Sequence, residues 1–419
     1  MRCTDRRWTS SEDRAPARAS VKAIDALSPE TVITGHGAAM RGQDMQQALA
    51  ELARQLTKGS SRGEVRLETL PAATRLYEGA SGETHMPRTR ARTIIITGAS
   101  AGVGRAIAKR FAEAGDRIGL IARDEDALRD VARELQGRSA HTEYEAVDVA
   151  DAQALFEAAE RLEQRLGPVD IWINDAMETV FSTVADITPD EFRRVTEVTY
   201  LGFVHGTMAA LRSMRRRGEG RIIQIGSALA YRGIPLQAAY CGAKHAIRGF
   251  TDSLRAELLH ERSRITLCMV DLPAVNTPQF DWARAHLAHT PRPMGRPVEP
   301  EVIADAVYRV ADGGFREYWI GWPTLLTILG NAVAPALLDR YLAAKAIAGQ
   351  QTDVPLVPDR SDNLDQPVTR LHRTRGSFSQ GAGHQAMLVP GDVARAATVA
   401  IGAAIFFALG ATVQRRRRR

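Results

Sequence analysis

The sequence predicts an α/β protein in which helices cover both faces of a parallel β-sheet of about seven strands, the doubly wound arrangement. Between positions 93 and 325, short apolar runs alternate with helical segments of ten or more residues. The runs are apolar throughout, rather than at every second residue, which is typical of parallel strands buried on both faces. Right-handed crossovers through the intervening helices then produce a doubly wound sheet.

The expected strands and helices follow one another in a regular order. The strands are TIIIT (93–97), RIGLIA (117–122), TEYEAV (142–147), VDIWIN (169–174), RIIQIG (221–226), RITLCMV (264–270) and REYWIG (316–321). The helices include a segment beginning near Val103, EDALRDVARELQ (125–136), AQALFEAAERLEQRL (152–166) and EPEVIADAVYRVAD (299–312). Residues 93–325 are therefore expected to form the main domain.

Residues 1–92 form an N-terminal extension without a recognisable complete domain, and we expect part of it to be disordered. Within it, residues 24–53 read as a strand, a GHG turn and a helix. This stretch resembles the C-terminal part of metallo-β-lactamase-fold hydrolases. Zinc needs three or four protein ligands, and His36 alone cannot supply them. A fusion remnant or a misassigned start is therefore favoured, and no metal site is expected.

Three segments follow the main domain. Residues 326–350 are expected to form an apolar helical extension, broken at Pro335. Residues 351–395 are rich in Pro, Asp, Ser and Gly, which predicts a flexible linker. Residues 396–413 are uncharged and are followed by five arginines, so 396–419 is predicted to be an apolar helix with a basic tail. Contact with the inner face of the cell membrane is favoured; the alternative is a helix packed on protein.

Charge and cysteine content narrow the function further. The net charge of +6 is concentrated at the ends: residues 1–93 carry 15 basic and 11 acidic side chains, and five terminal arginines add five charges. The remaining residues are slightly acidic, which argues against nucleic acid as a partner. Three cysteines lie far apart without a CxxC motif, which fits a reducing cytoplasm.

The motif TGASAGVG (97–104) joins the first predicted strand to the first helix. Its glycines permit a tight turn and let a pyrophosphate approach the amides at the helix N-terminus. The TGxxxGxG spacing resembles that of the short-chain dehydrogenase/reductase family over residues 91–325, and the resemblance implies a Rossmann-type fold. It also implies coenzyme contacts from Gly98, Ser100, Gly102 and Gly104.

Further residues match this family's pattern. Asp148 stands where the family has an acid that meets the adenine amino group; the alternative is a helix N-cap. In INDAM (173–177), Asn174 and Ala176 fit the usual NNAG motif, while Asp175 and Met177 depart from it. Thr277 in DLPAVNTPQF is implied to meet the nicotinamide carboxamide.

Arg123 ends the second predicted strand, where family members distinguish their coenzymes. An acid at this place accepts the ribose hydroxyls of NAD(H), whereas an arginine suits the 2′-phosphate of NADP(H). The resemblance therefore favours NADP(H) over NAD(H). The adjacent Asp124 complicates this argument, although it could equally cap the following helix.

The stretch AAYCGAKHA (238–246) places Tyr240 one helical turn before Lys244. Ser227 ends a predicted strand 13 residues before Tyr240. This spacing resembles the family's Ser–Tyr–Lys arrangement: the serine holds the substrate oxygen, the tyrosine exchanges a proton with it, and the lysine lowers the tyrosine pKa and binds ribose. The alternative is a solvated helix face.

One position departs from that arrangement. VTEVTYLGF (195–203) carries Thr199 where many members have an asparagine whose backbone carbonyl holds a water of the proton relay. A backbone contact would survive this change, whereas a side-chain contact would not.

The resulting hypothesis is an NADP(H)-dependent oxidoreductase that interconverts a carbonyl and an alcohol on a lipophilic small molecule. A homo-oligomer is expected from the resemblance, in the cytoplasm and attached to the inner face of the cell membrane. The alternative is a nucleotide-binding scaffold or redox sensor with little turnover.

Overall fold

A computed structural model describes residues 31–32, 40–41, 90–358, 360–400 and 402. The chain divides into two units, Met1–Thr89 and Arg90–Arg419. In the first unit, β1 (Thr31–Val32) and β2 (Met40–Arg41) form an antiparallel pair. The rest of the segment compared with metallo-β-lactamase-fold hydrolases, including His36, lies outside the described residues.

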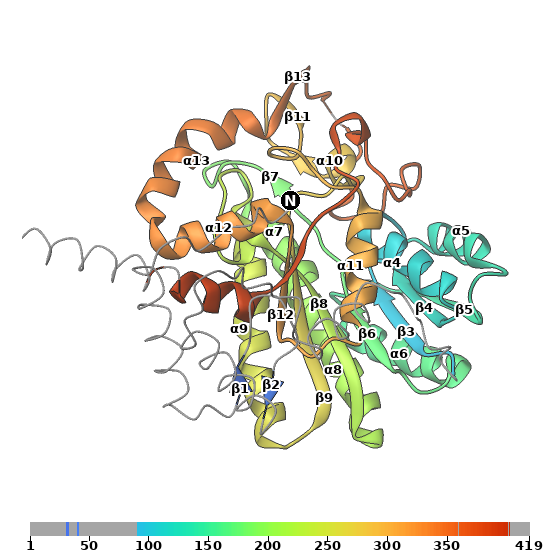
Figure 1. Ribbon diagram of the computed structural model, residues 1–419. Helices are drawn as coiled ribbons and strands as arrows, with labels where there is room; N and C mark the ends of the chain where they lie inside the picture. Colours follow the sequence, from blue (N-terminus) through green and yellow to red (C-terminus); the bar gives the residue numbers. More distant parts are fainter. Residues whose placement is uncertain (1–30, 33–39, 42–89, 359, 401, 403–419) are drawn as a thin grey trace, which may run out of the picture. The chain divides into compact units, whose positions relative to one another are not determined.

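The second unit is built on an eight-stranded sheet with the order β14-β12-β9-β8-β6-β3-β4-β5 (Figure 1). Its parallel strands are β3 (Thr93–Thr97), β4 (Arg117–Ala122), β5 (His141–Ala146), β6 (Ile171–Asn174), β8 (Glu219–Ser227), β9 (Arg264–Leu272) and β12 (Glu317–Ile320). The expected doubly wound α/β fold is therefore confirmed. The eighth strand, β14 (Leu388–Pro390), pairs antiparallel with β12 and was not predicted.

Helices cover both faces of the sheet. One face packs against α4 (Gly102–Glu113), α5 (Glu125–Leu135) and α11 (Pro300–Val310), and the other against α6 (Ala152–Leu166), α8 (Gly202–Arg217) and α9 (Ala238–His260). Strand β3 shows why a strand of this sheet is apolar at every residue. Ile94 and Ile96 lie in the hydrophobic core on one face of the sheet, and Ile95 lies in the core on the opposite face.

Local sequence explains several boundaries. Asp124 caps α5 by accepting the Ala127 amide, and Asp151 caps α6 by accepting the Ala154 amide. α7 (Pro189–Thr196) begins with a capping box between Thr188 and Glu191. It continues directly into the π-helical turn η2 (Glu197–Leu201) and then into α8.

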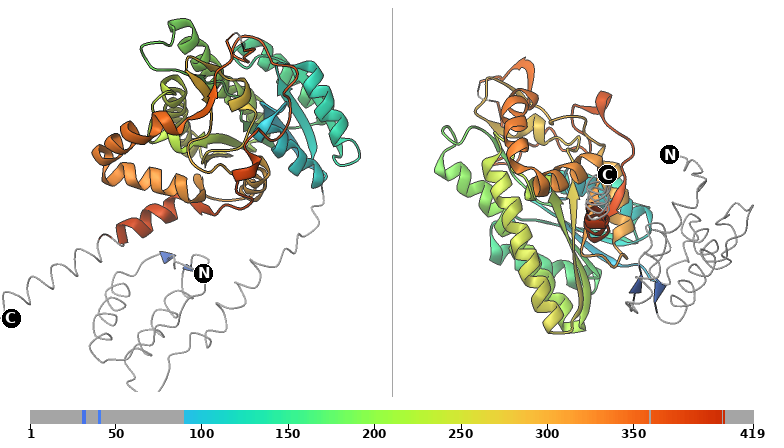
Figure 2. Two further views of the ribbon diagram at one scale, coloured as in Figure 1. Left: turned by 90° about the horizontal axis from the view of Figure 1, so that it is seen from above. Right: turned by 60° about the vertical axis from the view of Figure 1, so that its left-hand side comes forward.

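Two helices beyond β12 form the predicted apolar extension. α12 (Gly321–Val333) and α13 (Pro335–Gly349) are separated at Ala334 and Pro335, because proline cannot continue the helix that precedes it. In Figure 1 they lie toward the upper end of the sheet, where β7 (Val180–Phe181) and α10 (Gln279–Trp282) also lie, and Figure 2 shows them from above.

The expectation of a flexible linker over 351–395 was wrong for most of this segment. β13 (Gln351–Pro355) pairs with β11 (His289–Pro291), the 3₁₀ turn η4 (Ser379–Gly381) follows, and β14 completes the sheet. The polar composition does not leave the segment unfixed, because backbone and side-chain groups between residues 360 and 383 form hydrogen bonds with the main domain. Hydrogen bonds hold the segment in place, together with the buried side chain of Leu364 and the packing of Phe378.

The helix that begins at Gly391 is described only to Ala400 and at Gly402, so most of the predicted tail lies outside the described residues. Within the part of the chain that the structure describes, no helix is long and apolar enough to cross a membrane.

Candidate active site

A cavity of about 1150 Å³ opens at the carboxyl ends of the parallel strands. Its walls come from the segments after β3, β4, β5, β6, β8 and β9, where side chains and amides from distant parts of the sequence converge. The strand order reverses between β3 and β6, which is the place where open α/β sheets bind ligands. This volume is slightly above the range of about 300–1,000 Å³ that is typical of small-molecule and cofactor sites.

The glycine turn forms one end of this cavity. Gly98 has φ +73°, and a Cβ there would lie 2.8 Å from the backbone of Ala176. A Cβ on Gly104 would lie 2.3 Å from the Gly98 carbonyl oxygen. Only glycine permits this close packing of β3, α4 and the β6 loop. Gly98, Ser100 and Gly102 line the cavity, so the turn fits the phosphate-binding role expected of it.

Asp175 and Ala176 bring the β6 loop against this turn. Both amides donate to Thr97 Oγ1, over 3.1 Å and 3.3 Å. The Asp175 carboxylate accepts a hydrogen bond from the Gly104 amide and faces Lys244. Burial raises the pKa of Asp175 to about 7, against the opposing charge of Lys244.

Asn174, which was expected to contact the coenzyme, does not reach the cavity. Its side chain is fully buried, donates to Thr207 Oγ1 (3.1 Å) and Gln224 Oε1 (2.9 Å), and accepts from the indole of Trp172 (2.8 Å). These bonds tie β6 to β8 and α8. The asparagine therefore supports the sheet beneath the site, and Ala176 supplies the cavity wall.

Ser227, Tyr240 and Lys244 meet in the cavity as expected. Ser227 ends β8, and its Oγ accepts the Leu229 amide at 3.1 Å, which starts the 3₁₀ turn η3 (Ala228–Ala230). Its hydroxyl also bonds to that of Tyr240. Lys244 is buried one turn further along α9, with its Nζ 5.6 Å from the Tyr240 ring centroid. The three side chains can bind and protonate a substrate oxygen.

Burial changes the acidity of both groups on α9. It raises the pKa of Tyr240 above its ordinary value, and the hydrogen bond from Ser227 opposes this. Burial also lowers the pKa of Lys244 to about 8, while the charges of Asp175 and Asp271 oppose that shift. Burial therefore shifts the pKa of Tyr240 in the direction opposite to the lowering expected from Lys244.

Thr199 lies beneath the cavity rather than in its wall. Its Oγ1 donates to the Glu178 carbonyl and accepts the Glu178 amide, both over 2.9 Å. The side chain is fully buried in the π-helical turn, a type of turn found frequently at functional sites. Its hydroxyl thus positions Glu178, and the proposed relay through its backbone carbonyl stays a prediction.

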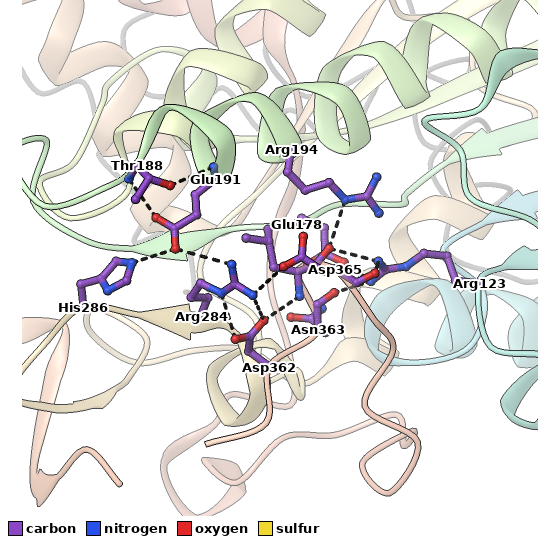
Figure 3. A network of polar contacts seen from close by, with 11 residues as sticks. Arg123, Glu178, Thr188, Glu191, Arg194, Arg284, His286, Asp362, Asn363 and Asp365 are labelled. Atoms are coloured by element: carbon purple, nitrogen blue, oxygen red, sulfur yellow. Dashed lines mark hydrogen bonds and ion pairs between the residues drawn. The ribbon is translucent and has the colours of Figure 1, made fainter. Parts of the chain in front are cut away.

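Arg123 reaches the cavity wall but is already paired (Figure 3). Its guanidinium bonds to the Glu178 carboxylate and to the backbone carbonyl oxygens of Asn363 and Leu364, the latter at 3.1 Å. Burial raises the pKa of Glu178 to about 8, and the charges of Arg123 and Arg194 oppose this rise. Asp124 also lines the cavity, where it accepts the Ala127 amide and lies 3.1 Å from His372 Nε2.

Asp148 also lines the cavity, as expected for an adenine contact. The alternative of a helix cap does not hold, because Asp151 caps α6. One Asp148 oxygen accepts the Ala150 amide at 2.9 Å, and the other pairs with Arg194.

Thr277 and α10 close the opposite wall of the cavity. Thr277 lies against the glycine turn, since a Cβ on Gly102 would be 3.2 Å from Thr277 Cγ2. Phe280 and Trp282 of α10 are mostly buried and line the cavity.

The part of the cavity formed by α12 and α13 is largely apolar. Helices α12 and α13 contribute Leu326, Leu337, Leu338, Tyr341 and Leu342 to its lining, together with Lys345. The extension predicted at 326–350 therefore helps to form the site.

The sequence did not predict a role for the C-terminal segment at this cavity. Asn363, Pro367, Val368 and His372 form part of the wall. Among the described residues, no group of three or more His, Cys, Asp or Glu side chains could hold a metal ion.

A family model described as short chain dehydrogenase matches residues 92–287. The chain is 29% identical over 291 residues to Uncharacterized oxidoreductase YxnA of Bacillus subtilis, covering 68% of this chain and 81% of that protein. It is 30% identical to Dehydrogenase/reductase SDR family member 7B of Xenopus tropicalis, and the match covers 60% of this chain and 85% of that protein. A solved short-chain dehydrogenase from Streptomyces avermitilis is 25% identical, with a TM-score of 0.52, over 61% of this chain and 97% of that one. Residues 24–53, the segment compared with metallo-β-lactamase-fold hydrolases, lie outside the residues that the family model matches.

Proposed function

Because the chain belongs to the short-chain dehydrogenase/reductase family of oxidoreductases, we propose that it interconverts a carbonyl and an alcohol on a lipophilic small molecule, with NADP(H) as coenzyme. One observation carries this proposal: Ser227, Tyr240 and Lys244 line the same cavity as the glycine turn. A proton-transfer group and a phosphate-binding turn thus face one shared space.

Each residue has a distinct task in this reaction. A bound nicotinamide coenzyme supplies or accepts the hydride. Ser227 hydrogen-bonds the substrate oxygen, and the Tyr240 hydroxyl beside it donates or accepts the proton. The Lys244 ammonium stabilises negative charge on Tyr240 and is held in place by the Ile225 carbonyl oxygen at 2.8 Å.

The choice of NADP(H) is supported by the end of β4. Arg123 lies in the cavity wall, where its positive charge suits a 2′-phosphate. The neighbouring acid, Asp124, caps α5 through one oxygen and meets His372 through the other, 3.1 Å from Nε2. One oxygen of the carboxylate that would favour the ribose hydroxyls of NAD(H) is therefore engaged by the cap of α5.

A lipophilic substrate is supported by the helices that cover the far part of the cavity. Its lining from α12 and α13 includes four leucines and Tyr341, beside Thr324, Thr327 and Lys345. An apolar ligand gains free energy when such leucine and tyrosine surface is removed from water. Assembly into a homo-oligomer and attachment to the inner face of the cell membrane are further parts of the proposal.

The test is oxidation of NADPH by the full-length protein against a panel of carbonyl compounds of increasing chain length. Tyr240→Phe removes only the hydroxyl and is expected to lower kcat by about 100-fold or more. Its affinity for NADPH should stay within about twofold of the wild-type value, because the aromatic ring remains. NADPH binding without oxidation of any substrate, equal in both proteins, would favour the alternative of a scaffold or redox sensor.

A further inference from the structure

The C-terminal segment 362–378, here called the strap, crosses the coenzyme end of the cavity. In Figure 1 the orange-red chain loops beside α10 and α4 before it returns to β12. Its residues Asn363, Pro367, Val368 and His372 line the same cavity as the glycine turn. The space is therefore bounded by the turn on one side and by the strap on the other, and the strap covers the cavity without filling it.

The first end of the strap is fixed by charged side chains (Figure 3). The Asp362 carboxylate accepts two hydrogen bonds from Arg284, over 2.9 Å and 3.1 Å, and also accepts the Leu364 amide at 3.0 Å. The Leu364 carbonyl oxygen accepts from both Arg194 and Arg123 at 3.1 Å. The Leu364 side chain is buried in a small core with Val180.

The second end of the strap lies on the helix that begins at the glycine turn. The amide of Gly102 donates to the Arg373 carbonyl oxygen at 3.0 Å. Arg105 donates to the His372 carbonyl oxygen at 2.9 Å, and Lys109 donates to Thr374 Oγ1 at 3.0 Å. Three successive strap residues thus meet the first two turns of α4.

The loop after β9 holds this second end from the other side. The Gly376 amide donates to the Asn276 carbonyl oxygen at 3.0 Å, and a Cβ on Gly376 would lie only 2.3 Å from the Thr277 carbonyl oxygen. Arg373 also forms a 2.7 Å ion pair with Asp281. The strap therefore connects α4, α10 and the end of β4, which all form part of the cavity wall.

We propose that the strap is the roof of the coenzyme site: it encloses the adenosine and phosphate end of the dinucleotide, and it must open before the coenzyme can enter or leave. This inference rests on the proposed function, because it assumes that a nicotinamide dinucleotide occupies the cavity. It predicts that opening of the strap limits the rate at which the coenzyme dissociates. Loosening the strap should then speed coenzyme release without any change to the catalytic residues.

Two variants loosen the strap at separate places. Asp362→Asn weakens the contact with Arg284, and Gly376→Ala forces the chain away from the Thr277 carbonyl. Matched controls are Asp305→Asn, which weakens an exposed ion pair with Arg110, and Gly381→Ala, where an added Cβ meets nothing within 4 Å. All four are made in the full chain.

The measurement is the dissociation rate of NADPH, followed by its fluorescence during a chase with excess NADP⁺ in a stopped-flow instrument. Each strap variant is expected to raise this rate by about fivefold or more, as loss of one partly buried hydrogen-bonded contact implies, while the controls stay at the wild-type rate. If both strap variants bind NADPH normally but release it at the wild-type rate, the proposal that the strap is a roof is refuted. The proposed function is then unaffected. Failure of all five proteins to bind NADPH or NADH would overturn both proposals.

Discussion

The ammonium group of Lys244 donates a 2.8 Å hydrogen bond to the carbonyl oxygen of Ile225. This bond ties α9, which carries Tyr240, to the strand that ends at Ser227. Two segments far apart in the sequence are thereby held in one geometry, with the ammonium also 4.5 Å from the ring centroid of Phe203.

Lys244→Met should therefore lower kcat by about 100-fold or more, because it removes a charge-bearing donor at the reacting group and leaves the Ile225 carbonyl oxygen without it. Lys244→Arg keeps the charge and is expected to recover part of the loss. Steady-state NADPH oxidation, with circular dichroism to verify folding, measures both. Equal rates for the methionine variant and the wild type would remove Lys244 from the mechanism.

Asp175 should make the stability of the protein depend on pH. Its pKa is about 7 in the folded protein, against about 4 in an unfolded chain. Because the buried carboxyl group favours its protonated form, the contribution of Asp175 to the stability of the fold is greatest below pH 4. This contribution is lost as the pH rises through 7 and the folded protein must deprotonate Asp175. Between pH 5 and 8, Asp175→Asn should lose less unfolding free energy than the wild type.

Thermal and urea unfolding at both pH values measure this difference. Asp305→Asn is the control, because its side chain is exposed on α11. If the free energy of unfolding changes equally with pH in the wild type and in Asp175→Asn, the assignment of the raised pKa to Asp175 is contradicted.

Arg123→Ala separates two roles of that guanidinium. If it binds the 2′-phosphate, the affinity for NADPH should fall by about tenfold more than the affinity for NADH, because a charge-assisted bond is lost only with the phosphorylated coenzyme. A smaller loss of affinity, equal for NADPH and NADH, would reflect only the lost contact between Arg123 and Leu364 in the strap. Fluorescence titration gives the two dissociation constants; an identical loss for both coenzymes would refute the 2′-phosphate role.

Gly206 lies where α8 crosses the buried network of Asn174. A Cβ at this position would lie 2.2 Å from Asn174 Oδ1 and 3.0 Å from Trp172 Nε1. Gly206→Ala is therefore expected to destabilise the protein by about 1–3 kcal/mol through overpacking. Gly249→Ala, on the helix α9 with nothing within 4 Å of its added Cβ, should be neutral or slightly stabilising. Urea unfolding compares the two, and equal stabilities would show that α8 moves aside without cost.

Deletion of residues 390–419 tests the proposed membrane contact. The uncharged stretch and its five arginines predict that the full chain partitions with the cell membrane and that the truncated chain does so less. Cell fractionation measures the partition. Because β14 ends at Pro390 and Arg395 pairs with Glu317, a second variant with Arg415–Arg419 replaced by serine keeps the folded contacts intact. No change in partition for either variant would refute the proposal.

The Gly98 turn, strand β3 and the Tyr240–Lys244 pair could be predicted because each depends on local rules: an apolar run, a glycine spacing and a helical periodicity. The buried position of Asn174 could not. Whether that amide meets a coenzyme or a core depends on Thr207 and Gln224, which come from other elements. Motif matching identifies a position along the chain, but the direction of a side chain follows from packing.

The sequence by itself determined the order of strands and helices, the glycine turn and the spacing of Ser227 from Tyr240, since all of these arise from interactions between residues near one another along the chain. Only the tertiary structure decided what the polar C-terminal segment does. It has few apolar residues to mark it as folded, and the groups that hold it, such as the Gly102 amide and Arg284, lie 78 or more residues away along the chain. Hydrogen bonds over such a separation have no periodicity in the sequence, and so they become visible only when the chain is folded.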